Sequence, residues 1–116
     1  MPYYEKLLEY IKSGVDNMIV SMLAIMYYII GYITSENLDD IISRVDSSYD
    51  SSTDILTYNG NEYTINDLIN YSIINIYKSD FNVSYDLLFW AIRDSLIKEK
   101  ITELQATTLL ETLSNA

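Results

Sequence analysis

Cysteine and histidine are both absent from this chain of 116 residues. Without cysteine, it can form no disulfide, no thiolate zinc site and no thiol nucleophile, and a reducing compartment is allowed. Without histidine, it lacks the commonest general base, the usual metal ligand and every Ser-His or Cys-His arrangement. Only carboxylates, tyrosines and a few basic residues remain for chemistry. We therefore predict that the protein is not an enzyme and that it binds no cofactor.

Basic residues are also scarce. The chain has 7 Lys and Arg residues against 17 Asp and Glu residues, for a formal net charge of −10, and only Arg44 and Lys78 are basic between Ser13 and Ile92. Binding to the phosphate backbone depends on clustered positive charge. The composition therefore argues against a direct nucleic-acid binder.

Length and composition indicate one folded domain over residues 1–116. Hydrophobic residues make up 49% of the chain and charged residues 21%, a balance that allows a buried core. Apolar residues recur at helical spacing in six segments, beginning near Tyr4, Asn17, Ser35, Thr64, Ser84 and Thr102. Ser35, Thr64, Ser84 and Thr102 are of the residue types that cap helix N-termini. We predict a mainly α, single-domain bundle of about six short helices.

One small β-hairpin is expected at residues 54–64. Asn59-Gly60 lies there between two β-prone segments, and this dipeptide is the strongest short-range hairpin signal. The preceding DSSYDSST stretch, rich in Ser and Asp, is predicted to be a loop.

The segment from Asn17 to Ser35 contains no charged residue. Its most apolar part, Met18 to Ile33, would form a helix about 24 Å long, whereas the hydrocarbon core of a bilayer is about 30 Å thick. We therefore predict a central helix buried in the bundle rather than a membrane span. A bundle with a buried central helix resembles the apoptosis-regulator fold in architecture only, without a groove motif.

The aspartates at every fourth position, Asp46, Asp50 and Asp54, suggest a calcium loop. Such a loop needs glycine at its sixth position and a bidentate glutamate at its twelfth. Counted from Asp46, those positions are Ser51 and Thr57. We therefore predict no metal site.

Two other features admit a functional and a structural interpretation. The acid pairs Asp39/Asp40 and Asp86/Asp94 could supply two-carboxylate catalysis, but we interpret them as solvated helix faces. Phe89 and Trp90 point about 100° apart on a helix. We expect one of them in the core and the other partly exposed as an interface anchor.

The acidic segment from Ser35 to Asp67 carries the functional prediction. It contains eight acidic residues against Arg44 alone, interleaved with tyrosine, serine and asparagine. Tyrosine supplies contact area and small polar residues supply adaptable hydrogen bonds at binding surfaces. The predicted partner-binding residues are Asp39, Asp40, Asp46, Tyr49, Asp50, Asp54, Tyr58, Glu62 and Tyr63. The alternative is that the acid only keeps the protein soluble.

From these features we expect a non-enzymatic inhibitor in the cytoplasm of the producing or host cell. Its acidic surface would occupy the basic surface of a nucleic-acid-handling enzyme, as in an anti-defence protein of a phage or mobile element (an anti-CRISPR, for example) or an immunity protein against a nuclease toxin. Two alternatives stay open. One is a structural or regulatory helical bundle that self-associates, for example as a homodimer, and the other is a small membrane-anchored protein.

Overall fold

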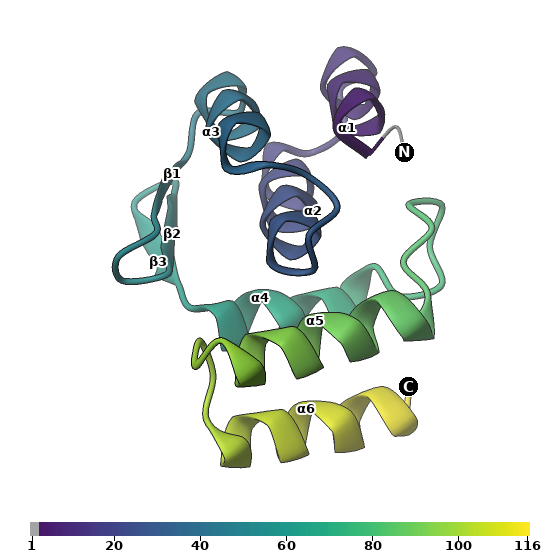
Figure 1. The fold of residues 1–116 in the computed structure, drawn as a ribbon. Helices are drawn as coiled ribbons and strands as arrows, with labels where there is room; N and C mark the ends of the chain where they lie inside the picture. Colours follow the sequence, from purple (N-terminus) through teal and green to yellow (C-terminus); the bar gives the residue numbers. More distant parts are fainter. Residues whose placement is uncertain (1–2) are drawn as a thin grey trace. The chain divides into compact units, whose positions relative to one another are not determined.

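The computed structural model describes residues 3–116, and its fold is mainly α, as predicted. Contacts within the chain group into two compact units, one ending at Glu62 and the other running from Tyr63 to Ala116. Over the described residues, the elements are α1 (Tyr3–Lys12), α2 (Asn17–Ile29), α3 (Ser35–Arg44), β1 (Ser48–Asp50), β2 (Ile55–Tyr58), β3 (Asn61–Tyr63), α4 (Ile65–Asn75), α5 (Tyr85–Ile97) and α6 (Glu103–Ser114) (Figure 1).

The starts of the later helices are fixed by capping side chains, largely where the sequence predicts them. Thr64 and Thr102 each accept a hydrogen bond in a capping box, and Ser84 accepts one from the backbone N–H of Leu87. The prediction for α3 is wrong by one residue. Thr34 is its N-cap and Ser35 its first residue, because the capping box forms between Thr34 and Asn37.

Helix α2 is the buried helix that the sequence predicts. Ten of its 13 residues are buried, and it contacts α1 and α3. The helix ends at Ile29, before the left-handed Gly31 at φ 85°. Within the part of the chain that the structure describes, no helix combines the length and apolar character needed to cross a bilayer.

Tyrosines pack against the end of α2. The rings of Tyr3 and Tyr32 are stacked, with centroids 4.4 Å apart, and Tyr27 lies beside both at 5.0 and 6.2 Å. Tyr27 is only 2% exposed, and its burial raises the pKa of the phenol well above 10. This cluster joins α1 to the C-terminal end of α2.

The hairpin expected at residues 54–64 is present, but it belongs to a three-stranded sheet in the order β1-β2-β3. Asn59 and Gly60 both have positive φ, at 52° and 78°, as a two-residue type I′ turn requires. The prediction that DSSYDSST is only a loop is wrong, since Ser48–Asp50 forms β1. Tyr49 pairs with the fully buried Leu56 across the antiparallel ladder, and this pairing favours a strand despite the flanking Ser and Asp.

In the second unit, α4, α5 and α6 contact one another, and α5 runs antiparallel to the other two (Figure 1). An isolated parallel bridge between Tyr77 and Val83 closes the connection from α4 to α5. Lys78 and Asn82 within that connection have left-handed backbones, at φ 63° and 55°.

The prediction that only one of Phe89 and Trp90 is exposed is wrong. They are 37% and 36% exposed, respectively. The buried stripe of α5 consists of Leu87, Leu88, Ala91, Ile92 and Ser95. Because this stripe already fills the inner side of the helix, both aromatic rings lie on the outer side.

Candidate functional site

The nine candidate residues lie on α3, on the segment that follows it, and on the three strands. Asp39 and Asp40 belong to α3, and Asp46 to the segment between α3 and β1. Tyr49 and Asp50 are in β1, and Asp54 lies in the turn that leads into β2. Tyr58 ends β2, and Glu62 and Tyr63 belong to β3. Helix α3 contacts β1, so the candidate residues on the helix lie next to the sheet.

Asp40 makes internal bonds rather than being fully available to a partner. Its Oδ2 accepts a hydrogen bond of 2.5 Å from the Tyr4 hydroxyl and one of 2.9 Å from Nε of Arg44. The Tyr4 bond, followed by the Arg44 bond, lowers the pKa of the Asp40 carboxyl below its usual value. Asp40 thus ties α1 to α3 and neutralises the only basic residue of the acidic segment.

Tyr49 and Asp54 are likewise bonded to each other. The Tyr49 hydroxyl donates to Oδ1 of Asp54 at 2.6 Å, across the turn between β1 and β2. Burial, and then this hydrogen bond to a carboxylate, raises the pKa of Tyr49 well above 10. Asp54 has a left-handed backbone at φ 57°. Their observed bond stabilises the turn.

Asp50 organises the same turn from its other end. Its Oδ1 accepts hydrogen bonds from the backbone N–H and the hydroxyl of Ser52, at 2.9 and 2.7 Å. These bonds lower the pKa of the Asp50 carboxyl, so it carries its charge over a wider pH range. The residue remains exposed and therefore presents a fixed negative charge to solvent.

Asp46 is exposed on a backbone that is anchored on both sides. The preceding Val45 is fully buried, and the following Ser47 shares a hydrogen bond of 3.0 Å with the buried Ser21 of α2. Asp46 itself is left-handed, at φ 54°. A shallow polar hollow of about 360 Å³ lies beside it, lined by Asp46, Ser47, Ser48, Thr57, Asn59 and Gly60. A lysine or arginine side chain from outside would fit this chemistry.

The remaining candidates lie on β2 and β3. Glu62 is exposed, whereas Tyr58 and Tyr63 are half-buried. Five carboxylates of the first unit are therefore open to solvent around α3 and the strands, a group that we call the exposed acidic set: Glu36, Asp39, Asp46, Asp50 and Glu62.

Sequence reasoning missed the role of Tyr4, which no local pattern links to Asp40.

Among the described residues, no group of three or more Asp and Glu side chains is placed to hold a metal ion. The carboxylates of Asp50 and Asp54 make the hydrogen bonds to Ser52 and Tyr49 given above. Asp50 and Asp54 therefore stabilise the turn between β1 and β2.

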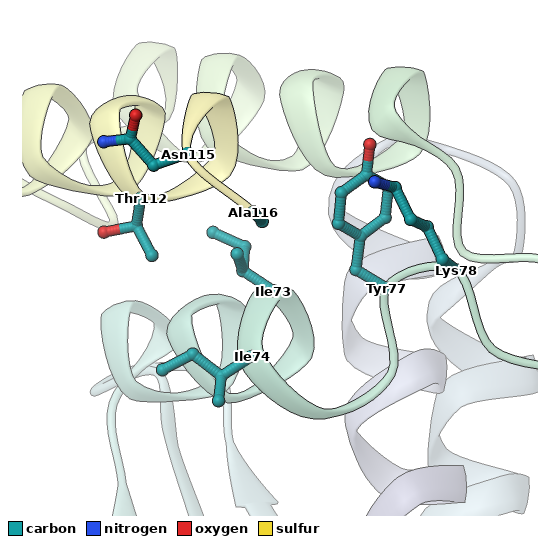
Figure 2. A pocket seen from close by; sticks show the side chains of 7 residues that line it. All are labelled: Ile73, Ile74, Tyr77, Lys78, Thr112, Asn115 and Ala116. Atoms are coloured by element: carbon teal, nitrogen blue, oxygen red, sulfur yellow. The ribbon is translucent and has the colours of Figure 1, made fainter.

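A second hollow, of about 460 Å³, lies between the ends of α4 and α6 (Figure 2). Ile73 points from α4 toward Ala116, and the side chains of Tyr77 and Lys78 lie side by side. Nζ of Lys78 is 4.9 Å from the centre of the Tyr77 ring, a cation–π distance. Lys78 is the one charged side chain among the lining residues.

Comparisons of this chain with protein-family models, with curated proteins and with solved structures found no match.

Proposed function

We propose that the protein is a non-enzymatic inhibitor whose exposed acidic set occupies the basic, nucleic-acid-binding surface of a partner enzyme. The observation that carries the proposal is the surplus of solvent-facing carboxylates around α3 and the strands. Arg44, the only basic residue from Ser35 to Asp67, is already paired with Asp40 at 2.9 Å. The negative charge of the exposed acidic set is therefore not compensated within that segment.

The backbone that carries these charges supports the proposal. Asp46 is held between the buried Val45 and the Ser47–Ser21 hydrogen bond, and Asp50 is held by Ser52. Charges fixed in the free protein lose little conformational freedom on binding, so less of the interaction energy is lost to ordering. A solubilising coat needs no such fixed geometry.

Tyrosine next to the acid supplies the second part of the binding surface. Tyr58 is half-buried at the end of β2, directly before the Asn59-Gly60 turn, and Tyr63 is half-buried at the end of β3. Aromatic rings of this kind give contact area at low entropic cost, whereas rim carboxylates mainly speed encounter. We therefore assign steering to the carboxylates and retention to the tyrosine.

The proposed mechanism is competition for a phosphate-binding surface. Lysine and arginine side chains that neutralise phosphates on nucleic acid would instead meet carboxylates of the exposed acidic set. Two kinds of protein are examples of this proposed role. One is an anti-defence protein of a phage or mobile element, such as an anti-CRISPR, and the other is an immunity protein against a nuclease toxin. The protein would act in the cytoplasm of the producing or host cell.

Affinity capture tests this proposal. Tagged protein is incubated at low salt with a nuclease-treated lysate of the organism that encodes it, eluted with a salt gradient, and the eluted proteins are identified. We expect a basic nucleic-acid-handling protein that elutes with salt and loses nucleic-acid binding in proportion to bound inhibitor. A captured protein that binds this chain and nucleic acid at the same time would contradict the competition mechanism.

A further inference from the structure

The outer face of α5 exposes several large apolar side chains. The acidic residues of the surface give no reason for this exposure. Within the part of the chain that the structure describes, every exposed large hydrophobic residue lies on α4, α5 or α6, and four are on α5: Tyr85, Phe89, Trp90 and Ile97. Tyr85 and Phe89 are stacked, with ring centroids 6.4 Å apart. Tryptophan, tyrosine and arginine are the residues most enriched at the energetic centres of interfaces.

Charged residues flank these rings in an ordered way. Positions 86, 90, 93 and 97 follow the spacing that brings residues onto one face of a helix. Asp86 is therefore near the start of the face, Trp90 in its middle and Arg93 toward its end, and both charged residues are exposed. Arg93 contacts Asp94 at 3.1 Å, and its own side chain is 53% exposed. Ion pairs at the protein surface contribute little to stability, so the guanidinium can turn to another carboxylate.

This order of charges is complementary to itself. When two copies of α5 pack antiparallel about a two-fold axis, residues equally far from the axis in opposite directions face each other. An axis midway between Phe89 and Trp90 places the rings of the two copies together. It also places Asp86 opposite Arg93 of the second copy, and Arg93 opposite its Asp86. The same face thus offers an aromatic centre and two opposite-charge pairs to its own copy.

We propose that the α5 face, formed by Tyr85, Asp86, Phe89, Trp90, Arg93 and Ile97, is a self-association surface on which a second copy of the chain docks antiparallel. One helix face buries less than the roughly 1,200 Å² at the lower limit of standard interfaces. The dimer is therefore reversible and forms as protein concentration rises. The surface is separate from the exposed acidic set, so each can fail without the other.

Charge reversal tests the proposed register. Asp86→Arg and Arg93→Asp each turn two attractive contacts into repulsive ones, because the contact between Asp86 and Arg93 occurs twice in a two-fold dimer. We expect each single variant to weaken dimerisation roughly tenfold. The double variant Asp86→Arg/Arg93→Asp exchanges the two charges and should restore dimerisation to near the level of the unmodified chain. Glu103→Arg is the matched control, because it also reverses an exposed acid in the first turn of a helix.

Two measurements give the result. Analytical ultracentrifugation over a concentration series reports the monomer–dimer equilibrium, and circular dichroism checks that each variant is folded. Trp90 is the only tryptophan of the chain, so its emission should shift to shorter wavelength as the unmodified protein dimerises. A protein that stays monomeric with unchanged Trp90 emission at high concentration overturns the proposal. So does a folded double variant that fails to dimerise while the Glu103→Arg control does.

Discussion

The Tyr49 hydroxyl donates a hydrogen bond of 2.6 Å to Oδ1 of Asp54, five residues further along the chain. This bond spans the turn between β1 and β2, while Tyr49 lies opposite the buried Leu56 in the strand ladder. Two residues that the sequence marks as partner contacts therefore hold the sheet together. The exposed acidic set, by contrast, excludes both of them.

Removing the Tyr49 hydroxyl should destabilise the fold. We expect Tyr49→Phe to lower the free energy of unfolding by about 1–2 kcal/mol, because a hydrogen bond to a charged group is lost from a half-buried site. Urea unfolding followed by circular dichroism measures this difference. Asp54→Asn should cost less, because an amide oxygen can still accept the bond and asparagine tolerates the left-handed backbone. A Tyr49→Phe variant as stable as the parent would show that the bond contributes nothing.

Alkaline pH should destabilise the protein through its buried tyrosines. The pKa values of Tyr27 and Tyr49 are raised in the folded state, first by burial and, for Tyr49, then by Asp54. Above pH about 10 these phenols ionise in the unfolded chain but stay protonated in the folded one. The stability they contribute is therefore complete below pH about 10 and is lost as the pH rises toward their folded values.

A pH titration of tyrosinate absorbance, run beside circular dichroism, checks this expectation. The chain has 12 tyrosines, and the absorbance change reports their ionisation together. The part of the change that belongs to Tyr27 and Tyr49 should appear only together with unfolding. Complete ionisation of all tyrosines in a folded protein would contradict the burial of these two phenols.

A charge placed in the middle of α2 should unfold the first unit. Ala24 is fully buried in that helix, and an unpaired carboxylate there costs several kcal/mol. We expect Ala24→Asp to abolish cooperative thermal unfolding. Ala24→Gly is the control, because it costs only about 1 kcal/mol through helix propensity. A folded, cooperative Ala24→Asp variant would show that α2 is not buried as described.

Local signals in the sequence account for most of the correctly predicted fold. Thr64 and Thr102 cap their helices with residues three positions away, and Asn59-Gly60 forms its turn within two residues. Strand β1 was missed because its determinant is not local. Ser and Asp disfavour a strand, and only the pairing of Tyr49 with Leu56 makes one.

The candidate site divides in the same way. Counting charges in the sequence locates the acidic segment, since that needs no structure. The sequence does not show which carboxylates make hydrogen bonds within the protein, because their partners can be distant in the chain. Tyr4 and Asp40, which are 36 positions apart, are an example. The exposure of both Phe89 and Trp90 likewise follows from how the buried stripe of α5 is used, and not from their adjacency.

The central claim, that the exposed acidic set is a site and not a coat, is tested most directly by association kinetics with the captured basic partner. One variant neutralises Glu36, Asp39, Asp46 and Glu62 to Gln or Asn, leaving the turn-forming Asp50 intact. The matched control neutralises four exposed acids of the second unit, Asp80, Glu99, Glu103 and Glu111, so both variants have the same net charge. Circular dichroism should show both folded, because single surface changes usually alter stability by about 0.5 kcal/mol or less.

The measurement is the association rate constant over a series of salt concentrations. We predict that the first variant associates roughly tenfold more slowly at low salt, with a flatter salt dependence, while the control stays close to the unmodified protein. Equal slowing of both variants would mean that only net charge matters, and unchanged rates in both would mean that the acid is a solubilising coat. Either result would contradict the proposed function.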